Sequence, residues 1–314
     1  MTPEPTTKRP DVVIGGRGFF ARALQREIAR RGRPLRVVTR EPKAIDAGSL
    51  PPGTEILRGD LNATKALPGH LQDAGAVYVA VPIASVAQSP GDWNPLPFLA
   101  ACAEAGVQLI VPLDLSLYKT DATAPFDEKV DFVGRNPVGD AQLEWENAAL
   151  MEGLRRRFAV TVLRLPPLLG EGLGDEELRG VIESARAGRA IEIVGRGEEV
   201  IERLHVDDAA RACVLAAARR EAAGEIFHVP GHPIRRRNFF RVLVKVAGSK
   251  SEVVSIEAPE WPRRRRRGLH EAPRDFWVRG EKARRLLGYV PEIPYERAIR
   301  ESLSSLPRRK IASG

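Results

Sequence analysis

The chain has 314 residues, of which 43% are hydrophobic and 29% are charged, and its formal net charge is +8. This length suits one large domain or two smaller ones, and this composition excludes a disordered or collagen-like protein. No apolar run in the sequence is long enough to cross a membrane, and the opening MTPEPTTKRP lacks the apolar segment of a secretory signal. Because Cys102 and Cys213 are the only cysteines, a disulfide framework is excluded and we expect a cytoplasmic protein.

The basic excess comes mainly from arginines that are spread along the whole chain. Such a bias informs on solubility and on the steering of charged ligands, not on the fold. A nucleic-acid surface interleaves basic residues with exposed aromatic ones, whereas aromatic residues make up 6% of this chain. We therefore expect a small-molecule substrate and neither a nucleic-acid nor a membrane partner.

Residues 1–10 are polar and proline-rich, and we expect a frayed leader there. From residue 11 onward, short apolar runs alternate with amphipathic segments. These predict strands over 11–16, 35–40, 55–60, 76–82, 107–113 and 158–166, and helices over 20–28, 97–106 and 138–157. Alternating strands and helices predict an α/β fold, a Rossmann-type doubly wound parallel sheet with helices on both faces.

Beyond Pro166 the alternation is looser. Helices are predicted over 177–188, 204–220, 238–248, 281–288 and 295–306, and short strands over 190–195 and 224–231. No segment reads as a linker between two independent domains. We therefore predict a Rossmann-type domain of residues 11–168 and 200–230, with a smaller C-terminal lobe of residues 169–199 and 231–314 folded onto it.

A glycine motif lies between the first predicted strand and the first predicted helix. Gly15 permits a tight turn, Gly18 lets the backbone approach a pyrophosphate, and Ala21 keeps the helix close to the strand. The free N–H groups and positive dipole end of the helix then favour phosphate. The strand–loop–helix context favours a dinucleotide site over the alternative, a glycine turn without a ligand.

The end of the second predicted strand bears on which dinucleotide would bind. An acidic residue there would hold a ribose 2′-hydroxyl and favour NAD, whereas Arg40 suits a 2′-phosphate and favours NADP. Arg17 in the glycine loop can add to such a site, and Asp60 follows the third strand at a position near the adenine. The alternatives are a solvated arginine at position 40 and a turn aspartate at position 60.

These residues together resemble the extended short-chain dehydrogenase/reductase family, the group of NAD(P)-dependent epimerases, dehydratases and dihydroflavonol-type reductases. The motifs that carry the resemblance, in order, are GGRGFFARAL, TREP, RGDL, AVYVAVP, AEAGVQLIV, PFDE, VLRLPPLLGEG, LHVDDAARA and GEIFHVPG. The resemblance covers roughly residues 11–304 and implies a seven-stranded Rossmann domain with a smaller C-terminal substrate lobe. It implies a cofactor, NADP rather than NAD, at Gly15, Arg17, Gly18, Phe19, Arg40, Asp60, Leu61, Val81 and Gln142. It also implies a homodimer.

The catalytic positions depart from that family. The family has a serine after the AGV strand and a Tyr-x-x-x-Lys pair at the start of a long helix. Here Asp114 stands at the serine position, with Ser116 two residues further on, and Val138 and Gln142 stand at the tyrosine and lysine positions. Valine transfers no proton, and glutamine carries no charge that would lower the pKa of a neighbour. Ordinary carbinol–ketone redox chemistry should therefore be lost or severely slowed.

Asp114 is the strongest candidate for a group that takes over from the missing catalytic residues. It follows a parallel strand at the edge where ligands of open sheets bind. Partial burial would raise its pKa and suit it to acid–base work, with Ser116 positioning a substrate oxygen. The alternative for each is a loop or capping role. We expect structural roles for Tyr118 and His205, and helix capping rather than metal binding for Asp207 and Asp208.

The run Arg263–Arg267 suits a phosphorylated or carrier-bound substrate or an acidic protein face, with a solvated loop as the alternative.

Three functions remain open. The first is a non-redox enzyme, a lyase, isomerase, dehydratase or cyclase acting on a small metabolite through Asp114. The second is an NADPH-dependent reductase or epimerase with a substitute proton donor. The third is a catalytically silent NADP(H) sensor or scaffold.

Overall fold

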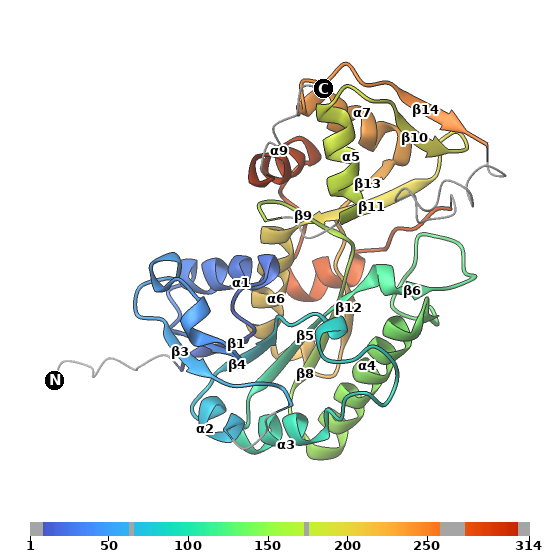
Figure 1. The fold of residues 1–314 in the computed structure, drawn as a ribbon. Coiled ribbons are helices and arrows are strands. Elements are labelled where there is room, and N and C mark those ends of the chain that lie inside the picture. The colour runs from blue at the N-terminus through green and yellow to red at the C-terminus, as the bar shows by residue number, and fades with distance from the viewer. Residues whose placement is uncertain (1–8, 63–65, 173–175, 258–273, 307–314) are drawn as a thin grey trace.

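The structure is a computed structural model that describes residues 9–62, 66–172, 176–257 and 274–306. Seven strands form one parallel sheet in the order β12-β8-β5-β4-β1-β2-β3 (Figure 1). They are β1 (Asp11–Ile14), β2 (Leu35–Thr39), β3 (Glu55–Arg58), β4 (Ala76–Val79), β5 (Gln108–Asp114), β8 (Val160–Leu165) and β12 (Ile226–His228). The strand order reverses between β1 and β4, and open sheets bind ligands at the carboxyl ends beside such a point. The predicted doubly wound Rossmann-type sheet is confirmed.

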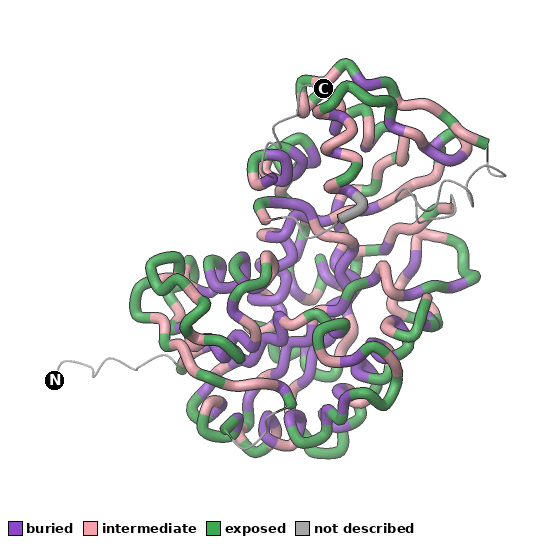
Figure 2. Tube along the Cα trace, viewed as in Figure 1, coloured by how far each residue is buried: buried purple, intermediate pink, exposed green. Residues whose placement is uncertain are grey.

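Helices cover both faces of this sheet. One face carries α1 (Phe19–Arg30) and α6 (Val206–Ala217), and the other carries α2 (Leu67–Leu71), α3 (Leu96–Ala105) and α4 (Pro137–Arg156). On the first face, buried Leu24 and Ile28 belong to the same apolar cluster as a run of alanines on α6, whose small side chains permit close helix packing. Figure 2 shows that buried residues concentrate in the strands and on the helix faces turned toward them.

A smaller C-terminal lobe lies above the carboxyl ends of the strands (Figure 1). Its helices are α5 (Glu176–Arg186), α7 (Arg236–Val246) and α9 (Tyr295–Ser305), and they share an apolar core that includes Ile182, Phe239 and Leu243. Its strands are β9 (Leu168–Leu169), β10 (Ile191–Val194), β11 (Val200–His205), β13 (His232–Arg235) and β14 (Val253–Ile256). The lobe therefore covers the edge of the sheet where a ligand would bind.

Several elements differ from those that the sequence predicts. The segment 200–205 is strand β11 and α6 begins at Val206, because His205 itself supplies the helix cap. The predicted helix over 281–288 is largely a π-helical turn, Ala283–Leu287, that ends at Gly288 with a φ of 69°. A short hairpin of β6 (Tyr118–Lys119) and β7 (Val133–Gly134) was not predicted.

Two further predictions cannot be compared with the structure in full. Residues 1–8 of the predicted leader, and the run Arg263–Arg267, lie outside the described residues. Within the described part of the chain, no helix combines the length and the apolar character needed to cross a membrane.

Candidate functional site

A cavity of about 690 Å³ opens at the carboxyl ends of β1, β4 and β5, under the C-terminal lobe. Its size falls in the range of small-molecule sites, and apolar side chains make up most of its wall. The structure brings eight of the predicted site residues together in its lining: Gly18, Phe19, Leu61, Val81, Asp114, Ser116, Val138 and Gln142. Gly15, Arg17, Arg40 and Asp60 are not part of the lining.

The glycine loop leaves room for a phosphate at the start of α1. Gly15 has a φ of 97°, and a Cβ there would lie 2.9 Å from Cγ2 of Val81, so a larger residue would be both strained and crowded. Gly18 precedes the helix without a side-chain cap, and a Cβ there would meet nothing closer than the Cβ of Ala21 at 4.0 Å. The start of α1 therefore lies at the cavity without a side-chain cap, which suits a pyrophosphate site.

Three polar residues border this loop. Arg40 is exposed just after β2 and makes no hydrogen bond or ion pair with another described residue. Arg17 is paired with Glu41, at 3.0 Å from its Nη1 to Oε2, between two exposed side chains. Asp60 accepts a hydrogen bond from the backbone N–H of Asn62 at 3.0 Å on Oδ1. The chain after β2 thus carries the guanidinium of Arg40 and then the carboxylate of Glu41, which is paired with Arg17.

Asp114 ends β5 and caps the 3₁₀ turn that follows. Its Oδ1 accepts a hydrogen bond from the backbone N–H of Ser116 at 2.8 Å. The expected partial burial of Asp114 is wrong, because the turn directs the residue away from the sheet and leaves it exposed. Gln142 is buried and binds the backbone of Asp114 at both ends, accepting from its N–H at 3.1 Å and donating to its carbonyl at 2.9 Å. Gln142 therefore fixes the position of Asp114.

The tyrosine and lysine of the resembled family have no equivalent in this cavity. Val138 and Gln142 lie one turn apart on α4, and both face the cavity. Among the described residues, the lining contains no tyrosine, lysine, histidine or cysteine. Tyr118 is fully buried outside the lining and donates a hydrogen bond to Oε2 of Glu146 at 2.8 Å. Burial and that carboxylate raise the pKa of Tyr118 far above its usual range, so it stays neutral.

A buried polar network underlies the cavity and was not predicted. Arg164 of β8 makes a two-pronged ion pair with Glu146 of α4, and both side chains are more than nine-tenths buried. The Arg164 guanidinium also lies 5.1 Å from the ring centroid of Phe132. Two features of the sequence could have indicated this pair. Arg164 is the one charged residue inside an apolar strand, and Glu146 follows Gln142 by four residues, as Gln142 follows Val138.

His228 completes this network in its neutral form. Its Nε2 lies 3.4 Å from Nη1 of Arg164 and its Nδ1 lies 3.3 Å from the carbonyl oxygen of Phe126. The arginine can only donate and the carbonyl can only accept, so the ring carries its proton on Nδ1. Burial and the Arg164 charge lower the pKa of His228 to about 3.

The neutral His228 makes folding sensitive to acid. Between the pKa of an unfolded histidine and the value of about 3 in the fold, the unfolded chain binds one more proton, so stability falls as the pH falls. Between pH 7.5 and 5.0 the free energy of unfolding should fall by about 2 kcal/mol less in His228→Asn than in wild type. Asparagine at this position keeps a donor and an acceptor. Urea unfolding at both pH values measures this. Equal losses would contradict the assignment.

Glu202 of β11 is a second feature that the sequence did not reveal. It is buried, lines the cavity, and accepts hydrogen bonds from the backbone N–H groups of Gly231 at 3.0 Å and Val278 at 2.9 Å. Burial raises the pKa of Glu202 to about 8. At neutral pH this carboxyl group therefore contributes little negative charge to the cavity wall.

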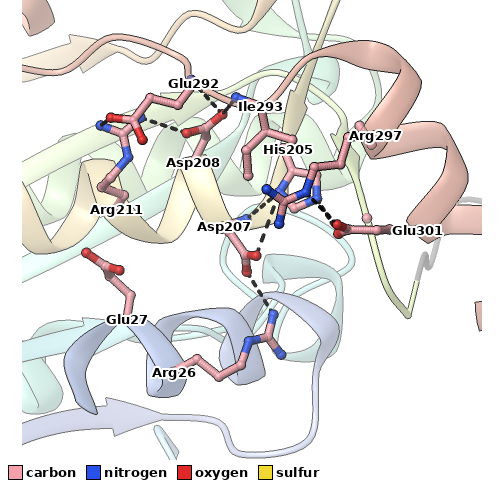
Figure 3. Close-up of polar contacts among 12 residues, drawn as sticks. Arg26, Glu27, His205, Asp207, Asp208, Arg211, Glu292, Ile293, Arg297 and Glu301 are labelled. Carbon is pink, nitrogen blue, oxygen red and sulfur yellow. Dashed lines mark hydrogen bonds and ion pairs between the residues drawn. The ribbon is translucent and has the colours of Figure 1, made fainter. Parts of the chain in front are cut away.

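A set of hydrogen bonds and ion pairs links the C-terminal lobe to the Rossmann-type domain (Figure 3). Nδ1 of His205 accepts from the backbone N–H of Asp207 at 3.1 Å, and its Nε2 lies 2.9 Å from Oε2 of Glu301 on α9. Asp207 is also paired with Arg26 of α1 at 2.8 Å. The expected cap by Asp207 and Asp208 is thus corrected to a cap by His205. Ligand atoms of His205, Asp207 and Glu301 lie within 4.8 Å of one another, but each already has a protein partner, which favours a structural role.

Comparisons with known proteins indicate the family to which this architecture belongs. The model of the NAD dependent epimerase/dehydratase family matches residues 12–229, more than half of the chain. The chain is also similar to the 2-alkyl-3-oxoalkanoate reductase of Stenotrophomonas maltophilia (strain K279a). The two are 26% identical over 336 residues, which cover 94% of this chain and 98% of that protein.

Solved structures share the fold at low identity. A UDP-glucuronic acid 4-epimerase from Bacillus cereus in complex with NAD has a TM-score of 0.77 at 18% identity, covering 94% of this chain and 98% of that chain. A UDP-glucose 4-epimerase from Thermotoga maritima has a TM-score of 0.76 at 18% identity with the same coverage. Apart from Asp11 at the start of β1, the matched residues 12–229 contain all seven strands of the sheet, together with the glycine loop and β11. The chain therefore belongs to the NAD-dependent epimerase/dehydratase family.

Proposed function

We propose that the protein binds NADP and uses Asp114 as a general base on a small, mainly apolar carbonyl compound, in a reaction that leaves the oxidation state of the substrate unchanged. This is the chemistry of an isomerase or lyase. The observation that carries the proposal is the pairing of an exposed carboxylate, Asp114, with an apolar residue, Val138, where the family has a serine and its catalytic tyrosine. An ionised carboxylate accepts a proton but cannot donate one, so a carboxylate at this position suits the role of a base.

The cofactor part of the proposal rests on the glycine loop and on Arg40. The open space at Gly18 and the uncapped start of α1 suit a pyrophosphate, and Leu61 and Val81 offer apolar contacts in the same lining. A bound nucleotide can donate or accept a hydride at its nicotinamide ring, but the proton transfer proposed here does not use that hydride. Arg40 supports the 2′-phosphorylated form, because a guanidinium binds phosphate through two parallel hydrogen bonds.

Thermal unfolding with added nucleotide tests the cofactor. A ligand at 100 times its Kd that binds only the folded state adds about 2.7 kcal/mol to the free energy of unfolding. We expect NADPH to raise the Tm more than NADH does, and Arg40→Ala to remove that difference while leaving the NADH shift unchanged. Arg219→Ala, which removes the same charge at an exposed position beyond α6, is the matched control. Equal shifts with the two nucleotides in wild type would contradict the preference for NADP.

Proton abstraction by Asp114 has a direct assay. The reductase relative suggests the probe, a 2-alkyl-3-oxoalkanoate, whose C2–H bond is flanked by two carbonyl groups. The Asp114 carboxylate would take the C2 proton, the electron pair would pass to the 3-oxo oxygen, and the hydroxyl of Ser116 would donate a hydrogen bond to that oxygen. In D2O the return step would place deuterium on C2. Loss of the C2–H resonance faster than in buffer supports the proposal, and exchange at the buffer rate for a series of chain lengths would overturn it.

An NADPH-dependent reductase is the second candidate. The full-length similarity to a reductase favours it, and so does the intact glycine loop. In this case NADPH would be consumed and a 3-hydroxy acid would form, with water or Ser116 supplying the proton that the missing tyrosine would give. Absorbance of NADPH therefore separates the two candidates on one probe.

A further inference from the structure

An apolar section of the cavity wall lies beside Asp114, after β4 and along α4. Its lining residues carry no charged side chain, and among them are Ile83, Val86, Trp93, Val138 and Trp145. Val138 and Trp145 lie two turns apart on α4 and so share one face of the helix. Gln142 between them uses both ends of its amide on the backbone of Asp114. This section therefore offers little to a hydroxyl or a charged group and suits a hydrocarbon chain.

Two tryptophans close this apolar section. The ring centroids of Trp93 and Trp145 lie 4.9 Å apart with an interplanar angle of 55°, which is a favourable aromatic pair. Trp145 packs in turn against Phe98 of α3 at 6.2 Å, and Phe98 is fully buried outside the lining. All three rings belong to one apolar core cluster. Because a close-packed core stands behind the pair, the wall resists displacement by a longer ligand.

The loop that carries Trp93 is fixed against α4. Oδ2 of Asp92 accepts hydrogen bonds from two backbone N–H groups of this loop, at 2.8 and 2.9 Å. The backbone N–H of Gly91 donates to Oε2 of Glu144 on α4 at 2.8 Å. The Nε1–H of Trp93 is buried and has no hydrogen-bond partner among the described residues. Packing therefore holds this ring, and a smaller apolar residue in its place would lose no hydrogen bond.

We propose that Trp93 is a specificity-determining residue, which ends the part of the cavity that holds a hydrocarbon chain of the substrate and so limits the length of that chain. The inference rests on the proposed function of this cavity and narrows its substrate to carbonyl compounds with an uncharged chain of limited length. Each buried methylene should tighten binding about fourfold. Once the chain reaches Trp93, a further methylene finds no apolar space, and the affinity should stop rising.

Calorimetric titration with 2-alkanones of increasing chain length, in the presence of NADP, tests this inference without any turnover. We expect the wild-type affinity to rise about fourfold per methylene and then to level off. Trp93→Leu should move that limit to a longer chain, and Val86→Phe, which narrows the same section, should move it to a shorter one. Trp277→Leu is the matched control, because Trp277 is partly buried and does not line the cavity.

Two further variants make the test specific. Trp93→Phe should shift the limit in the same direction as Trp93→Leu, and it serves if the leucine variant proves unfolded in thermal unfolding. Phe240→Leu changes the opposite wall, under the C-terminal lobe, and should leave the limit in place. A limit that moves in Phe240→Leu but not in the variants of Trp93 and Val86 would overturn the inference. So would a wild-type affinity that does not depend on chain length or that rises through the whole series.

The outcomes also separate the chain site from the chemistry. A chain-length limit that moves with Trp93 and Val86, without any C2–H exchange, would refute Asp114 as the base but not this assignment. Exchange faster than in buffer, with a limit that ignores both residues, would refute the assignment alone.

Discussion

Arg164→Met is expected to lower the free energy of unfolding by about 3–5 kcal/mol, the usual result of removing one partner of a buried ion pair. Methionine fills a similar volume but leaves the Glu146 carboxylate buried with Tyr118 as its remaining hydrogen-bond donor among the contacts described above. It also removes the cation from the ring of Phe132. The loss should appear in urea unfolding at pH 7.5, with the slope of the transition unchanged.

Two further variants make this result specific. Arg155→Met removes an exposed arginine that pairs with Glu152 on the same helix α4, and surface pairs of this kind contribute about 0–1 kcal/mol. Combining Arg164→Met with Glu146→Gln removes the uncompensated charge and keeps an oxygen for Tyr118, so we expect the double variant to recover at least half of the loss. A cost for Arg164→Met no larger than that for Arg155→Met would contradict the buried pair.

Asp114→Asn is expected to slow C2–H exchange by about 100- to 10,000-fold, the usual contribution of a positioned general base. Asparagine keeps an Oδ1 that can accept from the backbone N–H of Ser116, so the turn after β5 should survive while the base is lost. Proton NMR of the probe in D2O gives the rate, and thermal unfolding checks that the variant is folded.

Asp46→Asn is the matched control for this prediction. Asp46 caps a 3₁₀ turn in the same way as Asp114, accepting from the backbone N–H of Gly48 at 2.9 Å, but it does not line the cavity. Its substitution should leave exchange unchanged. If Asp114→Asn retained more than about a tenth of the wild-type rate, another residue would have to be the base.

The fold could be predicted from the sequence because its signals are local. Runs such as DVVI and VTVL are short, apolar and rich in β-branched residues, and glycine or proline residues separate them from the helices. Strand β11 was missed because Glu202 and Arg203 interrupt its apolar pattern. Both residues line the cavity under the C-terminal lobe, which is a tertiary requirement that no local pattern reveals.

The candidate site could be predicted in part. Spacing from neighbouring motifs placed Asp114, Val138 and Gln142 in one lining, as found. The sequence could not show that Asp114 is exposed, or that Gln142 binds the Asp114 backbone at both ends of its amide. Nor could it show that Ile201, Phe240 and Phe276 share this lining, because they come from separate segments of the chain.

We propose that the cavity combines a dinucleotide site with an acid–base group that is not a tyrosine. A single sample tests this combination: the protein, NADPH and a 2-alkyl-3-oxoalkanoate in D2O, followed by absorbance at the NADPH band and by proton NMR. We expect deuterium at C2 with the NADPH signal unchanged. Consumption of NADPH in step with the appearance of a 3-hydroxy acid, without exchange at C2 of the remaining probe, would contradict it.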